Sequence, residues 1–352
     1  MRPIHSLTLW GFSSIVCAAI LLAACGVATP TPAPRLKVGV VLDTGGIQDK
    51  SFNEYTLKGA REATAEAGLD FSYLPSQSTS DYEKNIEGLI GEGSDLVITV
   101  GFPLGDATAK AARRHPEVRF AIVDNAYFPG FGCPQSVQNC YTAEGGLSNV
   151  TSLMFAEDEV GYLAGVLAAC MSESGTVASV AGMEIPPVIR FVTGYQNGAR
   201  SVNPSVVTLN QYIPDFDDPA TGEVVAQGFI NRGADVIFGV GGNTGNGGLL
   251  AAKNAGVMAI GVDVDQYFTY PQVRDVLLTS ALKNVDVVAA AAVKEFAAGQ
   301  LAAGIEIATV ANDGVGLAPY HDWEPKIPPA CKEQVNRAEE AIRADPSITG
   351  AK

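Results

Sequence analysis

Short apolar runs that end in Gly or Asp alternate with helical stretches along most of the chain. The elements predicted in the first half lie at 37–43, 52–67, 69–74, 82–92, 96–101, 106–114 and 120–124. Their strands are continuously apolar instead of alternating between apolar and polar positions, which predicts parallel strands covered on both faces. The pattern therefore predicts a doubly wound α/β fold.

A second set of apolar runs follows the same order, at 176–181, 206–210, 236–240, 259–263 and 276–280. Residues 93–124 resemble residues 233–263, because both run strand, Gly-rich turn, helix, strand, Asp. We expect two Rossmann-like lobes whose strand ends surround a common cleft, with Asp124 and Asp263 facing the same space. Each aspartate has an alternative interpretation as a helix N-cap or an Asx-turn.

The N-terminal segment has the pattern of a secretory signal. Arg2 precedes an apolar run over 7–24, and no acidic residue occurs before Asp43. The sequence Leu-Ala-Ala-Cys-Gly at 22–26 is similar to the lipobox of bacterial lipoproteins, which predicts a lipid on Cys25. We expect a signal peptide over 1–24 and a Pro-rich, lipid-anchored linker over 25–35. Ordinary cleavage and an uncleaved membrane helix are the alternatives.

Composition and charge exclude several classes of protein. The 352 residues are 47% hydrophobic, a globular composition that excludes a disordered chain, collagen and a coiled coil. Lys and Arg number 23 against 38 Asp and Glu, so the surface should repel nucleic acid. A metal site is not expected, because the chain has three histidines and no Cys-x-x-Cys.

Four cysteines remain once the signal peptide and Cys25 are set aside. An even number outside the cytoplasm suggests disulfides, and four cysteines allow three pairings. We favour Cys133 with Cys140, which closes a short Pro-containing loop, and Cys170 with Cys331.

Six segments match one known family in its own order. They are 43–53, which holds Gly-Gly and Asp-Lys-Ser-Phe-Asn, then 120–124, 159–169, 182–195, 261–266 and 279–283. Together they resemble the basic membrane protein family, substrate-binding lipoproteins that bind purine nucleosides for ABC importers. The resemblance implies a fold of the type I periplasmic-binding-protein class with three hinge crossovers, near 144–158, 263–275 and 304–320. We expect lobe 1 at 36–143 plus 275–304, and lobe 2 at 144–274 plus 305–345.

The resemblance also implies which residues meet the base. Phe52 and Asn53 match residues that stack on the base and hydrogen-bond it, and Asp124 matches the carboxylate that reads the base edge. Phe191 resembles the second aromatic face, with Tyr195 as the alternative. Aromatic faces and carboxylates suit a neutral ligand with amine and hydroxyl donors.

The remaining candidates approach the sugar. Asp263 matches a ribose-hydroxyl acceptor and Lys283 a basic residue that reaches the nucleoside; a Lys283–Asp263 pair would keep the pocket near neutral. Asp49, within the first matching segment, is a further ligand-binding candidate. Gly242, in the Gly-rich run 239–248, either lets bare backbone approach the ligand or forms a tight turn.

These observations predict a monomeric, extracytoplasmic, lipid-anchored protein that delivers a nucleoside, most simply a purine nucleoside, to an ABC transporter permease. We expect no cofactor and no catalysis. A sensor, or a binding protein for another small molecule such as a sugar, remains the alternative. A nucleoside-cleaving enzyme ranks behind both, because we find no Asp-rich metal cluster.

Overall fold

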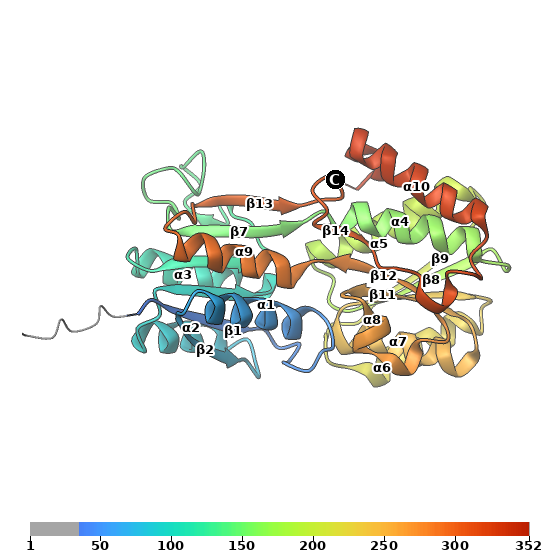
Figure 1. Cartoon of the computed structure of the whole chain (residues 1–352), viewed down its shortest axis with the longest axis horizontal. Helices are drawn as coiled ribbons and strands as arrows, with labels where there is room; N and C mark the ends of the chain where they lie inside the picture. The colour runs from blue at the N-terminus through green and yellow to red at the C-terminus, as the bar shows by residue number, and fades with distance from the viewer. Residues whose placement is uncertain (1–34, 352) are drawn as a thin grey trace, which may run out of the picture. The chain divides into compact units, whose positions relative to one another are not determined.

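The computed structural model describes residues 35–351 as two α/β lobes, each built on a six-stranded sheet (Figure 1). The two-lobed parallel architecture predicted from the sequence is confirmed. The expected signal peptide, Cys25 and all of the expected linker except its last residue lie outside the described residues. No helix between residues 35 and 351 is long and apolar enough to cross a membrane.

The sheet of lobe 1 is parallel throughout, in the order β13-β7-β4-β3-β1-β2. Its strands are β1 (Lys37–Leu42), β2 (Asp70–Pro75), β3 (Leu96–Val100), β4 (Arg119–Val123), β7 (Val150–Phe155) and β13 (Gly304–Ala308). Its helices are α1 (Phe52–Glu66), α2 (Asp81–Gly91), α3 (Gly105–Arg114), α9 (Val285–Ala297) and the short 3-10 helix η1 (Phe102–Leu104). Leu96 and Ile98 belong to one core and Val97 to the other, so burial on both faces explains the continuous apolar run of β3.

The sheet of lobe 2 repeats this order as β14-β12-β11-β10-β8-β9, with only its edge strand β14 antiparallel. Its strands are β8 (Thr176–Ala181), β9 (Val207–Tyr212), β10 (Val236–Val240), β11 (Met258–Asp263), β12 (Leu277–Lys283) and β14 (Val315–Leu317). Its helices are α4 (Glu157–Met171), α5 (Pro186–Val202), α6 (Pro219–Ile230), α7 (Gly242–Ala255), α8 (Gln266–Thr269) and α10 (Pro329–Ala344), with short 3-10 helices η2 (Pro271–Val273), η3 (His321–Trp323) and η4 (Pro346–Thr349). The similar segments 93–124 and 233–263 thus occupy equivalent positions in the two sheets.

The lobe boundaries differ from those expected. Strands β7 and β13 belong to lobe 1, because β7 pairs with β4 and β13 with β7, whereas the expected boundaries put both in lobe 2. Strand β12, expected in lobe 1, pairs with β11 in lobe 2. The chain therefore crosses between lobes at 155–157, 283–285 and 308–315. The expected second crossover, at 263–275, was wrong, since an apolar run does not reveal which sheet it joins.

Two disulfides connect the cysteine pairs favoured from the sequence. The Cys133–Cys140 bond closes a short loop of lobe 1 that begins at the last residue of β6 (Gly132–Cys133), the strand paired with β5 (Phe128–Pro129). The Cys170–Cys331 bond joins α4 to α10 across 161 positions of sequence. The C-terminal helix is therefore covalently fixed to the body of lobe 2.

Helices α4 and α5 touch backbone to backbone through glycines on both partners. A methyl group on Gly165 would lie 2.0 Å from the carbonyl oxygen of Tyr195, and one on Gly161 would lie 2.5 Å from that of Phe191. From the other side, a methyl group on Gly198 would lie 2.0 Å from the Tyr162 carbonyl oxygen. This close packing fixes the position of α5, whose first turns face the space between the lobes.

Candidate functional site

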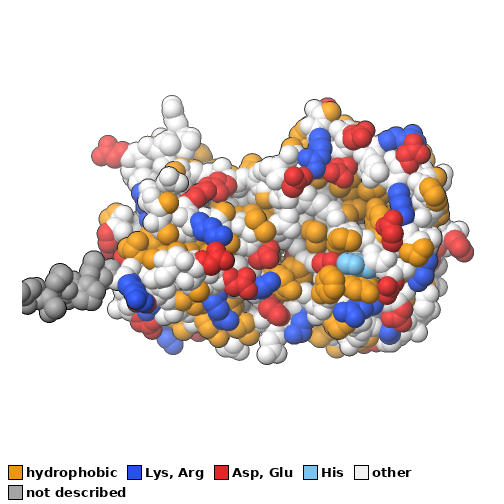
Figure 2. All heavy atoms as spheres, in the orientation of Figure 1, with side chains coloured by type: hydrophobic (Ala, Val, Ile, Leu, Met, Phe, Trp, Pro, Cys, Tyr) orange, Lys and Arg blue, Asp and Glu red, His pale blue; other side chains and the backbone are white. Residues whose placement is uncertain are grey.

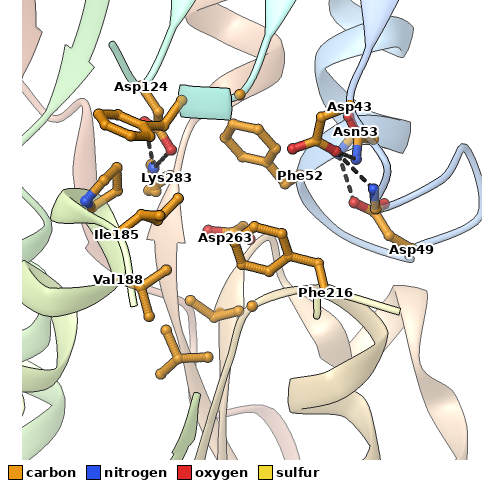
Figure 3. A pocket seen from close by; sticks show the side chains of 18 of the residues that line it. Asp43, Asp49, Phe52, Asn53, Asp124, Ile185, Val188, Phe216, Asp263 and Lys283 are labelled. Atoms are coloured by element: carbon orange, nitrogen blue, oxygen red, sulfur yellow. Dashed lines mark hydrogen bonds and ion pairs between the residues drawn. The ribbon is translucent and has the colours of Figure 1, made fainter. Parts of the chain in front are cut away.

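A cavity with an empty volume of about 540 Å³ lies between the lobes, at the carboxyl ends of their strands (Figure 3). Asp43 and Asp124 reach it from the ends of β1 and β4 in lobe 1. Asp263 and Lys283 reach it from the ends of β11 and β12 in lobe 2.

Asp124 and Asp263 occupy equivalent, left-handed backbone positions, with φ of 64° and 65°. Aspartate tolerates this conformation better than most residues. The two side chains do not cap their own helices: Lys283 donates to both oxygens of Asp124, and the Ser51 hydroxyl donates to Asp263 over 2.8 Å. The same turn in each lobe thus points one carboxylate into the cavity, as the sequence repeat predicted.

Lys283 is buried between carboxylates of both lobes. Its ammonium lies 2.6 and 2.5 Å from the Asp124 oxygens and 3.0 Å from Oε1 of Glu157. The expected pairing with Asp263 is therefore replaced by pairs with Asp124 and Glu157. Burial alone would lower the pKa of Lys283, but the carboxylates of Asp124, Glu157 and Asp263 together raise it above its ordinary value. Lys283 is accordingly a buried cation.

Burial also perturbs the aspartates of the cavity. It raises the pKa of Asp124 to about 7, against the opposing attraction of Lys283. Burial likewise raises the pKa of Asp263 and of Asp43, although hydrogen bonds from Ser51 and Asn53 oppose these shifts. The oxygens of these carboxyl groups accept hydrogen bonds, so the cavity favours a ligand that carries amine or hydroxyl donors.

Aromatic rings supply the apolar walls. Phe52, at the start of α1, enters from lobe 1, while Phe191 on α5 and Phe216 enter from lobe 2. Figure 3 shows Phe52 and Phe216 on opposite sides of the space above Asp263. Tyr195, the alternative to Phe191, does not line the cavity and packs in the core with its ring 4.9 Å from that of Phe238.

Asn53 lines the cavity and holds a buried acceptor without a partner among the described residues. Its Nδ2 donates to Asp43 over 2.8 Å, whereas its Oδ1 is buried and has no partner within residues 35–351. Because a buried acceptor without a partner is costly, this oxygen fits a donor on a bound ligand. Asp43 itself was not among the residues predicted from the sequence.

Asp49 and Gly242 have different roles in the local structure. Asp49 lines the cavity, yet its oxygens accept the backbone amides of Ser51, Asn53 and Glu54, so it stabilises the start of α1. Gly242 opens α7 with φ of 56°, and a methyl group there would lie 2.7 Å from the Phe216 carbonyl oxygen. Bare backbone thus lines the cavity at Gly242.

Besides the Lys283–Asp124 pair, further side-chain hydrogen bonds join the lobes beside the cavity. Ser51 donates to Asp263, Asn246 Nδ2 donates to the Asp49 carbonyl over 3.1 Å, and the Thr269 hydroxyl donates to the Lys50 carbonyl over 2.8 Å. The structure therefore has the lobes in contact on this side. No group of three or more His, Cys, Asp or Glu within the described chain is arranged to hold a metal ion.

Sequence reasoning missed Asp43, Phe216 and Glu157. Asp43 ends β1 as Asp124 ends β4, so its position after a buried strand was the available signal. Glu157 is fully buried, but it is the first of three consecutive acidic residues in the first turn of α4, so nothing in the sequence distinguished it from Asp158 and Glu159. Phe216 lies between β9 and α6, where no periodic pattern distinguishes it.

Comparison with known proteins gives matches over most of the chain. The family model "Bmp: ABC transporter substrate-binding protein PnrA-like" matches residues 36–342. The CD4+ T-cell-stimulating antigen of Listeria monocytogenes is 30% identical over 336 residues, covering 88% of this chain and 89% of that protein. The ABC transporter nucleoside-binding protein BmpA of Lactococcus lactis is 33% identical over 245 residues, covering 66% and 65% of the two chains.

Solved structures share the architecture. An ABC transporter solute-binding protein from Aeropyrum pernix matches with a TM-score of 0.77 and 27% identity, covering 88% of this chain and 91% of that one. A periplasmic solute-binding protein from Actinobacillus succinogenes, crystallised with D-allose, matches with a TM-score of 0.65 at 14% identity, covering 83% of this chain and all of that one. At that identity the second likeness shows the fold alone.

Proposed function

The chain belongs to the Bmp family of PnrA-like ABC transporter substrate-binding proteins, and from that membership we propose that it captures a purine nucleoside between its lobes. The protein then presents the nucleoside to an ABC transporter permease. We assign the binding role to Phe52, Asn53, Asp124, Phe191 and Asp263, with Lys283 and the backbone at Gly242 completing the site, and Asp49 supporting it.

The observation that carries the proposal is the combination of aromatic walls with an unused acceptor. Phe52 and Phe191 offer flat apolar faces to a base, for which stacking contributes about 1–3 kcal/mol. The partnerless Asn53 Oδ1 and the carboxylates of Asp124 and Asp263 accept hydrogen bonds from amines and hydroxyls. A purine nucleoside supplies both an aromatic base and those donors.

The electrostatics favour a nucleoside over a nucleotide. Lys283 is already paired with Asp124 and Glu157, so it is not free to neutralise a phosphate. The remaining carboxylates would repel that phosphate inside a cavity where charges are poorly screened. The chain as a whole carries a formal charge of -15, which opposes the approach of anions. Figure 2 shows acidic side chains scattered over this face, with Lys and Arg side chains between them.

The N-terminal segment supports a location outside the cytoplasm. A signal peptide ending before Cys25 would leave the folded lobes attached to the membrane through a lipid and the Pro-rich linker. The two disulfides are consistent with an oxidising compartment. We propose a monomeric, non-catalytic protein in this position. Mass spectrometry of the purified membrane form tests the lipid, because a diacylglyceryl group on Cys25 changes the mass of the N-terminal peptide.

A calorimetric ligand panel tests the nucleoside proposal. Residues 35–352 are titrated with inosine, guanosine, adenosine, free bases, nucleotides, ribose and amino acids. We expect saturable binding of purine nucleosides, weaker binding of free bases and no binding of nucleotides. Binding of a sugar or amino acid without any nucleoside would refute the proposed ligand and leave the family assignment intact.

Variants locate the site. Asp124→Asn and Asp263→Asn should each weaken nucleoside binding at least about tenfold, because hydrogen bonds to charged acceptors contribute about 1.5–3 kcal/mol. Asp70→Ala, at an exposed position that begins β2, is the control and should bind like the wild type. Wild-type affinity in both cavity variants would contradict the site assignment.

A further inference from the structure

Glu157 does not line the cavity but contacts Lys283, which does. The side chain is fully buried at the first position of α4, and it is absent from the residues that line the cavity. Its Oε1 lies 3.0 Å from the Lys283 ammonium, and its Oε2 accepts a hydrogen bond from Nε of Arg190 over 2.7 Å. Glu157 therefore links Arg190 on α5 to the base of the cavity.

The charges alternate along this connection. Arg190, Glu157, Lys283 and Asp124 follow one another as cation, anion, cation and anion, from the helices of lobe 2 to the end of β4 in lobe 1. Figure 3 shows the lobe 1 end, where Asp124 meets Lys283 above the cavity. Each inner member has a partner on both sides, which is the arrangement that buried charges require.

The connection also lies at the hinge. Glu157 is the last residue of the first crossover at 155–157, and Lys283 is the first residue of the second at 283–285. The ring of Phe155, the last residue of β7, lies 4.7 Å from the Lys283 ammonium. The Lys283–Glu157 pair thus joins two of the three crossovers at the place where lobe movement would begin.

A lysine needs such a partner because its side chain is flexible. Four rotatable carbons and three equivalent donors leave the direction of a lone ammonium undetermined. The rings of Phe52 and Phe191 lie 5.1 and 5.7 Å from this ammonium, so a displaced Lys283 would intrude on the faces offered to a base. Glu157 draws the ammonium from the lobe 2 side, opposite the pull of Asp124.

We infer that Glu157 is a positioning residue for ligand capture, which, held by Arg190, fixes the Lys283 ammonium against Asp124 across the hinge. The residue acts through Lys283 and makes no contact with the ligand. Its removal therefore changes binding only while Lys283 is present.

The first test needs no ligand. Lysine-selective ¹⁵N labelling and NMR detection of side-chain ammonium groups at pH 7 should give a protected Lys283 signal, assigned by its loss in Lys283→Met. Glu157→Gln should shift or broaden this signal. Glu159→Gln is the matched control, since Glu159 is buried on the same helix and, among residues 35–351, its side chain accepts a hydrogen bond only from the Val310 amide. An unchanged Lys283 signal in Glu157→Gln would overturn the inference.

The second test is a double-mutant cycle with inosine as the probe, and it rests on the proposed function. Glu157→Gln should raise the inosine dissociation constant about tenfold or more in the wild-type background and leave it unchanged in the Lys283→Met background. An equal loss in both backgrounds would show a merely structural role and overturn the inference. If another purine nucleoside of the panel binds instead of inosine, it replaces inosine as the probe. If none binds the wild-type protein, the nucleoside proposal fails, and the ammonium spectrum alone decides the role of Glu157.

A second variant keeps the inference testable if Glu157→Gln does not fold. Circular dichroism and the melting temperature establish whether Glu157→Gln is folded. If it is not, Arg190→Gln replaces it, because this change leaves the Glu157 charge but removes the group that fixes it. The same displacement of the Lys283 signal is expected, and its absence would overturn the inference.

Discussion

Replacement of Gly165 by alanine should destabilise the protein, although the same replacement usually stabilises a helix. Alanine is favoured over glycine in a helix interior by about 1 kcal/mol. At Gly165, however, the added methyl group would lie 2.0 Å from the Tyr195 carbonyl oxygen, while ordinary contacts begin at 3.4 Å. Because the obstacle is backbone, no side chain can turn away, and α4 and α5 must separate by more than 1 Å.

The magnitude follows from these opposing effects. Overpacking of a buried contact costs about 1–3 kcal/mol and more where backbone must move. We therefore expect Gly165→Ala to lower the free energy of unfolding by about 2 kcal/mol despite the gain in helix propensity. Gly228, exposed on α6 with nothing within 4 Å of an added methyl group, is the matched control. Gly228→Ala should raise the free energy of unfolding by about 0.5–1 kcal/mol.

Urea denaturation followed by circular dichroism measures both variants against the wild type. The two glycines should give shifts of opposite sign in the denaturation midpoint. A Gly165→Ala variant as stable as the wild type would refute the direct backbone contact. Gly161→Ala extends the experiment to binding, because its methyl group would press on the backbone of Phe191 and should displace that wall of the cavity.

Three further predictions concern single features. Phe52→Ala should weaken nucleoside binding in calorimetry by about 1–3 kcal/mol without loss of folding, whereas an unfolded variant would indicate that the ring serves the core. Burial raises the pKa of Asp49 from 3.8 to about 7, so its protonated form favours the folded state. The free energy of unfolding of the wild type relative to Asp49→Asn should therefore fall as the pH rises from 3.8 to about 7, and a constant difference in pH-dependent denaturation would contradict this. Replacing both Cys170 and Cys331 by serine should cost up to about 5 kcal/mol, read as a lower melting temperature, because their bond closes a loop of 161 positions.

The fold was largely predictable from the sequence because the determinants are local and repeated. Strands buried on both faces are continuously apolar, and the similar segments ending in Asp124 and Asp263 occupy equivalent positions. The family resemblance of short motifs is confirmed by the match over residues 36–342. Membership of β7, β12 and β13 in the two sheets was not predictable, because it depends on pairing between strands distant in sequence.

Some residues of the site could likewise be predicted from the sequence, and others could not. Asp124 and Asp263 could be predicted from the sequence, because each follows a buried strand at a sheet edge where ligands bind. Glu157 could not, because its importance arises from a 3.0 Å approach to Lys283, a residue 126 positions away. The partner of Lys283 was expected to be Asp263, since spacing along the chain does not reveal which lobe supplies the nearest carboxylate.

The interleaving of the lobes has a consequence for the order in which the chain folds during synthesis. Lobe 1 begins with β1 at residue 37 but is completed only when β13 arrives at 304–308, whereas five of the six strands of lobe 2 lie between 176 and 283. Before α9 and β13 are synthesised, the edge of β7 has no partner strand, and the face of the sheet that α9 later buries is uncovered. The first strand synthesised thus waits longest for a finished sheet, and such distant pairings fold slowly. Nascent lobe 1 accordingly exposes an unpaired strand edge until β13 has been synthesised.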